Sequence, residues 1–303
     1  MSELTIAHLS DFHLCIGPGS WRDLLTKRLY GRLAWRRRST EFEPAILESM
    51  IDDLGRQDPD LIVITGDQTH LGRRAEYHAA RALLETLGDP GKVMIIPGNH
   101  DAYVPGAWEA GRRLWAGYLS GDDAPEAVDG EIFYPVSRCR NGVEIIGLDT
   151  ACPRPWWLAT GKLGRDQLER LDGLLAAAAG QGRARVILIH HPPVPDLADW
   201  RRRLEDENAL AEILAARGAE LILHGHIHRR SRCLLVAGER RIPVFGVPAA
   251  AARGRLPERR SRYNLYRFSW SRKQGWRLAW KERRYSVSRS GFITETEWCD
   301  KFR

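Results

Sequence analysis

The chain has 303 residues, of which 43% are apolar and 28% are charged, and its net charge is +7. This composition is typical of a soluble globular protein and excludes a fibrous or largely disordered one. No apolar run approaches the roughly 20 residues that cross a bilayer, and the start of the chain lacks the pattern of a signal peptide. We therefore expect a cytoplasmic protein whose five widely spaced cysteines are reduced thiols.

The positive charge is concentrated in two segments. Residues 21–38 hold seven Arg or Lys against one Asp, and residues 253–284 hold twelve against two Glu. The rest of the chain is therefore mildly acidic. Such an arrangement favours anionic partners, namely phosphate groups, acidic lipid headgroups or nucleic acid.

Short runs rich in β-branched and apolar residues recur along the first three quarters of the chain, and each ends in polar residues. Runs of this kind are typical of strands buried on both faces. They lie at 4–11, 61–67, 92–101, 143–150, 185–193 and 221–228. Helical patterns fall between several of them, at 43–57, 74–88, 107–118, 164–180 and 206–217. The alternation predicts βα units around a largely parallel sheet.

After residue 228 the pattern changes to strand-like pieces without helices between them. These pieces read CLLVAG, RIPVFGV, YNLYRFSW and GWRLAWKERRY, and the last two flank SRKQG, which predicts a hairpin. We expect them to form a second, antiparallel-rich sheet packed against the first. Residues 286–303 are interpreted as a C-terminal tail.

The unusual polar residues of this chain stand where the predicted strands end. In open α/β sheets, the loops at the carboxyl ends of strands hold ligands on a rigid frame. Carboxylate, imidazole and amide groups without cysteine suit Mn, Fe, Zn or Co ions. The residues are Asp11, His13, Asp67, Asn99, His100, Asp101, His190, His191, His226 and His228.

Together these motifs resemble the calcineurin-like metallophosphoesterase family. Its ordered signature of Asp-x-His, Gly-Asp, Gly-Asn-His-Asp/Glu, His and Gly-His-x-His is met between residues 11 and 228. The resemblance implies an α/β fold, a four-layer sandwich of two mixed β-sheets flanked by helices, with a dinuclear metal site at the sheet ends. Residues 1–285 would then be a single metallophosphoesterase domain with a basic, Trp- and Arg-rich insertion at 17–42.

The resemblance assigns seven residues to metal binding, with Asp67 bridging two ions. The ions would be Mn or Fe, with Zn and Co as alternatives. A hydroxide bridging them would attack the phosphorus in line. One ion would be held by Asp11, His13, Asp67 and His228, and the other by Asp67, Asn99, His190 and His226.

Further residues are assigned around this centre. His100 matches the family histidine that faces the substrate, as a proton donor or as a stabiliser of the phosphoryl charge, and Asp101 would orient it. Asn99 is also a candidate substrate contact, as is Arg229, for which a solvated position is equally open. The other strand-end residues are interpreted as structural, namely His8, His70, His224, His191 and Asp149, with hydrogen bonding to the ligands as an alternative for the last two.

The predicted activity is metal-dependent hydrolysis of a phosphodiester or pyrophosphate bond. Two narrower activities within the family fit the motifs equally. One is a UDP-2,3-diacylglucosamine pyrophosphatase of lipid A synthesis that acts at the membrane surface, and the other is a cyclic nucleotide or glycerophosphodiester phosphodiesterase. A non-enzymatic interaction scaffold on the same fold is the alternative of a different class, against which the complete ligand set argues.

Residues 21–38 leave two interpretations open. The Trp, Leu and Arg residues form either an element that touches an anionic membrane surface or a lipid-linked substrate, or a basic insertion that packs a few leucines on the body. The first would place the protein peripherally on the inner face of the membrane. Aromatic residues within 253–284 suggest stacking on nucleic acid, but on strands they more often fill a core, so a small phosphoester is the expected partner.

Overall fold

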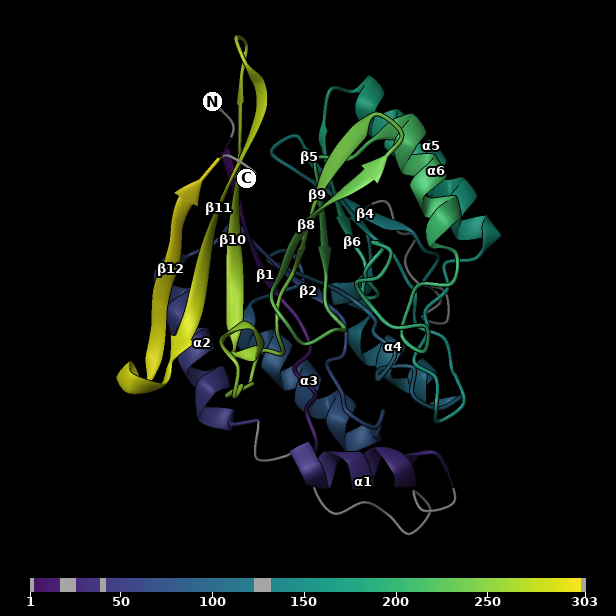
Figure 1. The fold of residues 1–303 in the computed structure, drawn as a ribbon, viewed down its shortest axis with the longest axis vertical. Coiled ribbons are helices and arrows are strands. Elements are labelled where there is room, and N and C mark those ends of the chain that lie inside the picture. The colour runs from purple at the N-terminus through teal and green to yellow at the C-terminus, as the bar shows by residue number, and fades with distance from the viewer. Residues whose placement is uncertain (1–2, 17–25, 39–41, 123–131, 301–303) are drawn as a thin grey trace.

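The computed structural model describes residues 3–16, 26–38, 42–122 and 132–300. Within these ranges the chain forms two six-stranded sheets packed face to face, with helices on their outer faces (Figure 1). The first sheet has the order β12-β11-β10-β1-β2-β3 and the second has the order β4-β5-β6-β7-β9-β8. The predicted four-layer sandwich of two mixed sheets is therefore confirmed.

The first sheet joins a parallel half to an antiparallel half. The parallel strands are β1 (Glu3–Leu9), β2 (Leu61–Thr65) and β3 (Val93–Ile96). The antiparallel strands are β10 (Arg262–Ser271), β11 (Gly275–Ser286) and β12 (Gly291–Cys299), and β10 pairs with β1. The helices packed on its outer face are α2 (Pro44–Gln57), α3 (Arg74–Leu87) and α4 (Ala107–Leu119).

The second sheet is parallel at its centre and antiparallel at both edges. Its central strands are β5 (Val143–Gly147), β6 (Ala184–Leu188), β7 (Leu221–His224) and β9 (Arg240–Gly246). Its edge strands are β4 (Val136–Arg140) and β8 (Ser231–Ala237). The outer face is covered by α5 (Arg165–Gly180) and α6 (Glu207–Arg217). Two short 3-10 helices lie at Pro257–Arg259 and Val287–Arg289.

The layers follow from the two-residue period of the strands. In β2, Leu61 and Val63 point into the apolar layer between the sheets, whereas Ile62 and Ile64 point under the outer helices. All five residues of this strand are buried. A strand covered on both faces needs apolar residues at every position, which is why these segments were recognisable in the sequence.

The expected second sheet of C-terminal strands is wrong. Strands β8 and β9 extend the sheet that contains β7, while β10, β11 and β12 extend the sheet that contains β1. The predicted hairpin is confirmed, with Ser271 opposite Gly275. The interpretation of 286–303 as a tail is also wrong, because Gly291–Cys299 pairs with β11. Periodicity identifies a strand, but it does not specify the neighbour to which that strand bonds.

Buried ion pairs connect the antiparallel half of the first sheet with α2 and with the segment that precedes β8. The Asp53 carboxylate of α2 accepts hydrogen bonds from the Arg283 guanidinium at 2.7 and 2.9 Å and from the Tyr263 hydroxyl at 2.5 Å. Glu282 of β11 similarly pairs with Arg230 at 2.7 Å and Arg262 at 3.3 Å. Each of these carboxylates thus faces guanidinium groups.

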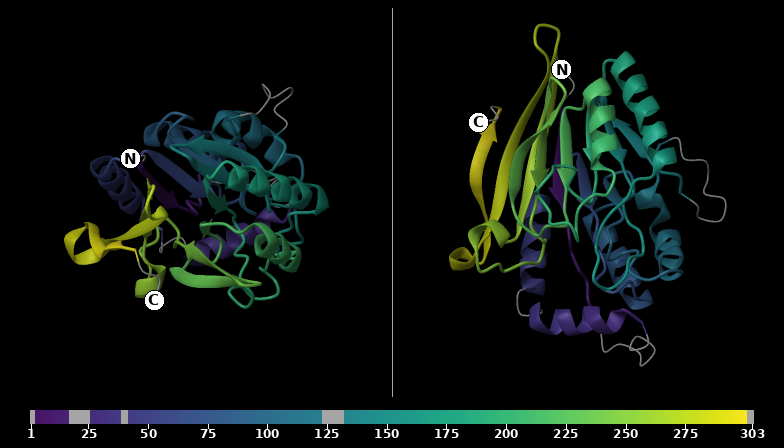
Figure 2. Two further views of the ribbon diagram at one scale, coloured as in Figure 1. Left: turned by 90° about the horizontal axis from the view of Figure 1, so that it is seen from above. Right: turned by 45° about the vertical axis from the view of Figure 1, so that its right-hand side comes forward.

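The predicted insertion at 17–42 contains α1 (Arg28–Arg38), while 17–25 and 39–41 lie outside the described residues. Figure 2 shows α1 crossing the lower end of the sandwich. The Arg28 guanidinium donates to the carbonyl oxygens of Leu71 and Gly72 at 2.9 and 2.6 Å. Among the helices described, none is long and apolar enough to span a membrane.

Candidate metal centre

The residues assigned to metal binding converge at one edge of the two sheets, at the ends of β1, β2, β3, β6 and β7. They form two groups that share Asp67, and within each group the ligand atoms lie within 4.8 Å of one another. Asn99 joins the second group, because its Oδ1 atom lies 3.2 Å from Nε2 of His190. The groups are Asp11, His13, Asp67 and His228, and Asp67, His190 and His226.

The backbone at these strand ends is unusual. Asp11, His13, Asp67, His226 and His228 all have φ between 48° and 70°, in the left-handed region that residues with a Cβ seldom adopt. This conformation turns the chain sharply directly after a strand, so that two side chains from one loop can face the same point. Strain of this kind persists where the surrounding structure holds it, typically at functional sites.

Two glycines allow the loops to approach the buried carboxylates. A Cβ atom on Gly98 would lie 2.2 Å from Oδ1 of Asp67, and one on Gly225 would lie 2.5 Å from Oδ2 of Asp11. Both distances are far shorter than a van der Waals contact. Glycine is therefore required at these two positions for the groups to assemble.

The donor set and its spacing fit two metal ions. Nε2 of His13 lies 2.8 Å from Nε2 of His228, which in turn lies 3.2 Å from Oδ1 of Asp11. Oδ2 of Asp67 lies 3.3 Å from Nε2 of His190. Ligand atoms bound at about 2.0–2.2 Å to one ion have neighbours about 3 Å apart, so these separations match a shared coordination sphere.

The charges point the same way. Asp11 and Asp67 are fully buried, and neither pairs with a Lys or Arg within the described ranges. A buried carboxylate needs a compensating positive charge. Burial opposes ionisation of Asp67, but His190 and His100 outweigh it and hold its pKa below the ordinary value. A bound cation would supply that charge while the imidazoles act as neutral ligands.

Two of the histidines are fixed through the nitrogen that points away from the cluster. Nδ1 of His190 lies 2.7 Å from the carbonyl oxygen of Thr65, and Nε2 of His226 lies 3.0 Å from that of Arg202. A carbonyl oxygen only accepts, so each of these nitrogens carries its proton. In the neutral ring the opposite nitrogen then carries the lone pair that a metal can bind.

His100 lies beside the first group and is partly exposed. Its ring stands edge-on to His13 at 4.7 Å and stacks between His70 at 5.1 Å and Tyr103 at 5.4 Å. Nδ1 donates to the His70 carbonyl oxygen at 2.6 Å, which leaves Nε2 as the second functional atom. Burial lowers the pKa of His100 to about 4, so the ring is neutral at pH 7 when nothing anionic is bound.

Asp101 is predicted to orient His100, and its described contacts are with the backbone of the two adjoining loops. Its carboxylate accepts hydrogen bonds from the backbone N–H groups of Gly98 and Thr69, both at 2.9 Å, and of Gln68 at 3.3 Å. The described hydrogen bonds of the His100 ring do not include Asp101. The carboxylate thus braces the two loops that carry Asp67 and His100, and it would orient His100 through the backbone.

Arg229 and the remaining histidines lie around the cluster. The Arg229 guanidinium donates to the Leu197 carbonyl oxygen at 2.9 Å. His191 packs on the His226 ring at 4.2 Å and hydrogen-bonds Thr150 at 2.7 Å. The other histidines bond within the fold, His8 to Thr65 and His224 to Ser231, and Asp149 accepts from the Ala151 N–H.

Sequence reasoning gave His70 a purely structural role and did not consider Tyr103. Both rings sandwich His100 in the structure. An aromatic residue three positions after His100, within the same loop, was the signal available for Tyr103. No comparable sequence signal marked His70, because its stacking on His100 depends on the conformation of the loop that follows Asp67.

Comparisons with known proteins agree with this geometry. A family model described as calcineurin-like phosphoesterase matches residues 4–230. A cAMP/cGMP dual specificity phosphodiesterase of Mycobacterium tuberculosis is 29% identical over 248 residues, which cover 80% of this chain and 66% of that protein. A probable cyclic nucleotide phosphodiesterase of Synechococcus is 27% identical over 260 residues, which cover 84% of each. The chain thus spans just under two thirds of the length of the first of these relatives.

Solved structures show the same fold. A dimetal phosphatase from Danio rerio superposes with a TM-score of 0.59 at 15% identity, over 97% of this chain and 98% of that one. A purple acid phosphatase from yellow lupin gives the same TM-score at 13% identity, over 99% of this chain and 53% of that one. Since the family model matches well over half of the residues, the chain belongs to the calcineurin-like phosphoesterase family.

Proposed function

We propose that this protein is a metal-dependent phosphodiesterase and that cyclic nucleotides are its substrate class. The carrying observation is the pair of ligand groups that share buried Asp67 beside the partly exposed His100. The names of relatives at 27–29% identity support cyclic nucleotides over the nucleotide-diphosphate sugar of lipid A synthesis. Metal ions bound there would polarise the phosphoryl oxygens and lower the pKa of a water molecule.

The side chains of the site have distinct tasks in this proposal. Asp67 belongs to both ligand groups and so fixes their separation. Asn99 supplies an amide oxygen, which adds a ligand without adding negative charge. The hydrogen bonds of His190 and His226 to backbone carbonyls keep their rings in one tautomer and orientation.

His100 is proposed to protonate the leaving oxygen. Its Nδ1 is already committed to the His70 carbonyl, so Nε2 is the atom available to a substrate. A bound phosphoryl group carries negative charge, which favours the protonated imidazole and raises its pKa toward neutrality. Transfer of that proton to the departing alkoxide completes cleavage of the phosphorus–oxygen bond.

A substrate panel tests the proposal. The purified protein is stripped with a chelator, reloaded with Mn, Fe, Zn or Co, and assayed for kcat/KM. The substrates are bis(p-nitrophenyl) phosphate, cyclic AMP, cyclic GMP, a glycerophosphodiester and UDP-2,3-diacylglucosamine. We expect the highest kcat/KM with a cyclic nucleotide. Absence of bound metal together with absence of hydrolysis would instead support a scaffold.

We also propose peripheral contact with an anionic membrane through α1 and the loop beside it. Large apolar side chains are exposed there, with Tyr30 at 47%, Leu33 at 48%, Trp156 at 55% and Trp157 at 51%, next to the basic residues of α1. Aromatic and basic side chains together suit a lipid interface.

Vesicle co-sedimentation tests this second proposal. We expect binding to vesicles containing phosphatidylserine, and we expect Leu33→Glu with Trp157→Ala to reduce it. Val236→Ser is the matched control, because Val236 is 66% exposed on β8 and belongs to neither α1 nor the 156–157 loop. Equal sedimentation of wild type and both variants with acidic and neutral vesicles would contradict membrane contact.

A further inference from the structure

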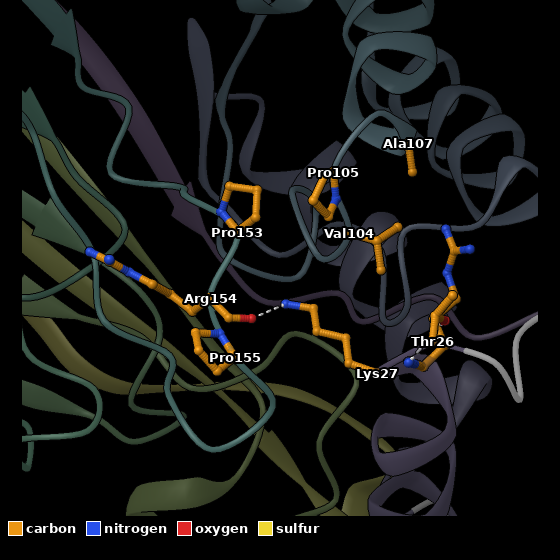
Figure 3. Close-up of a pocket in the computed structure, with 9 residues that line it drawn as sticks. Thr26, Lys27, Val104, Pro105, Ala107, Pro153, Arg154 and Pro155 are labelled. Atoms are coloured by element: carbon orange, nitrogen blue, oxygen red, sulfur yellow. Dashed lines mark hydrogen bonds between the residues drawn. The ribbon is translucent and has the colours of Figure 1, made fainter.

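A cavity of about 550 Å³ lies between α1 and two loops of the body (Figure 3). One loop follows His100 and the other follows β5. Much of the wall is apolar and is formed by three proline rings and two small aliphatic side chains. The lining residues are Thr26, Lys27, Arg28, Val104, Pro105, Ala107, Pro153, Arg154 and Pro155.

Tyr103 connects this cavity with the metal centre. One contact of its ring is the stack with His100, at 5.4 Å between ring centres. Another is with the Lys27 ammonium, which lies 4.3 Å from the ring centre. The ammonium is therefore within about 10 Å of the centre of the His100 ring, because these two contacts are in series.

Lys27 is the polar group that crosses the cavity. Figure 3 shows its side chain extending to the Arg154 carbonyl oxygen, to which Nζ donates a hydrogen bond of 2.8 Å. An ammonium has three N–H donors, and the described hydrogen bonds of this one use a single donor. Burial lowers the pKa of Lys27 to about 8, so the charged form still predominates at pH 7.

The guanidinium groups of the two lining arginines are engaged elsewhere. Arg28 donates to the carbonyl oxygens of Leu71 and Gly72. Arg154 pairs with Glu205 at 2.7 Å. Among the lining cations, Lys27 is thus the one held by the fewest described contacts.

We propose that this cavity binds the organic group of the substrate, and this proposal rests on the proposed phosphodiesterase activity. The group would be a flat ring with a hydrogen-bond acceptor on its edge, and Lys27 would donate to that acceptor. Proline rings and a valine form flat apolar walls, which suit a heterocycle better than a hydrated glycerol group. The volume is in the range of pockets for small ligands, and one directed donor is the usual means of orienting them. A nucleobase has this chemistry.

Two substitutions separate the cavity from the contact between Lys27 and Arg154. Lys27→Met keeps the length of the side chain but removes the donor and the bond to the Arg154 carbonyl. Val104→Trp fills the cavity and leaves that bond in place. Arg32→Met is the matched control, because Arg32 lies on α1 without lining the cavity.

The first measurement is binding to the metal-stripped protein by calorimetry, with GMP, guanosine and ribose 5-phosphate as probes. We expect GMP and guanosine to bind, and we expect Lys27→Met and Val104→Trp each to weaken them about 10-fold or more, as loss of a charge-assisted hydrogen bond or of the space implies. Arg32→Met should bind as wild type does. Equal binding of guanosine to all four proteins, or none to wild type, overturns the proposal.

The second measurement is steady-state kinetics with Mn. We expect Lys27→Met to raise KM for cyclic GMP about 10-fold. With a glycerophosphodiester as substrate, we expect both kcat and KM of this variant to equal those of wild type. An equal change for both substrates would show that Lys27 acts only by holding α1. Absence of hydrolysis by wild type would refute the proposed phosphodiesterase activity. The calorimetry tests ligand binding in the cavity independently of that activity.

Discussion

The protein buries two groups of carboxylates that differ in the bases facing them. Asp53 and Glu282 face guanidinium groups at 2.7–3.3 Å. Asp11 and Asp67 face imidazoles instead, and within the described ranges they meet no Lys or Arg. A guanidinium neutralises its partner permanently, whereas an imidazole can lose its proton and offer a lone pair. The facing base, more than burial, therefore distinguishes Asp53 and Glu282 from the candidate metal ligands Asp11 and Asp67.

The largest effect is expected from replacing Asp67, which belongs to the group of carboxylates that faces imidazoles. Asp67→Ala removes the carboxylate shared by both ligand groups, so we expect kcat/KM to fall by more than about 10³-fold and bound metal to be lost. In chelator the melting temperature should also fall, because the variant removes the acceptor of the His100 N–H and the partner of His190. Elemental analysis, kinetics and calorimetry measure the three effects; wild-type metal content in the variant would contradict the assignment.

His100→Ala should separate catalysis from metal binding. We expect metal content close to that of wild type and a fall in kcat of about 10²–10⁴-fold, the usual contribution of a general acid. Tyr103→Phe is the matched control, since it keeps the ring that stacks on His100. Undiminished turnover of His100→Ala would remove the residue from the mechanism.

The arginine-paired group should give the reverse pattern. Asp53→Asn leaves the Arg283 guanidinium without its anionic partner, so we expect the free energy of unfolding to fall by about 3 kcal/mol. Metal content and kcat should not change. Guanidinium denaturation measures the loss, and Asp53→Leu combined with Arg283→Met should recover most of it. A drop in metal content without a loss of stability would be inconsistent with a structural role.

The smallest effect is the pH dependence of this pair. Burial raises the pKa of Asp53, but hydrogen bonds from Arg283 and Tyr263 outweigh burial and hold it below its ordinary value. Stability from such a group is fully present above the unfolded pKa of about 3.9 and is lost as the pH falls through the folded pKa. The difference in unfolding free energy between wild type and Asp53→Asn should therefore narrow below about pH 4. A difference that stays constant down to pH 2 would show that ionisation of Asp53 contributes nothing.

Much of the fold was predictable because its central strands are buried on both faces. The five predicted helices agree with α2 to α6 to within a residue or so at each end. Strand partners were not predictable, since pairing depends on packing between segments far apart in the chain. The edge strand β12 escaped notice because its burial is incomplete and its sequence is mixed.

The candidate metal ligands lie together at the strand ends that the sequence marked. The support around them was less predictable. Asp101 is predicted to orient His100, but the partners of its carboxylate, the backbone N–H groups of Gly98, Gln68 and Thr69, could not be predicted from local sequence. The meeting of Lys27 with Tyr103 depends on how α1 docks, which no local pattern encodes.

The position of β12 also bears on self-association. A sheet edge offers unpaired backbone groups to other chains, and charged side chains or irregular pairing discourage that contact. β12 carries Glu295 and Glu297 on the outermost strand, and its pairing with β11 shifts register near Glu282. A chain ending before residue 291 would instead present the stretch of β11 from Trp280 to Ser286 as the edge. The last strand therefore protects the sheet edge from pairing with other chains. We expect the shortened chain to aggregate, which light scattering measures.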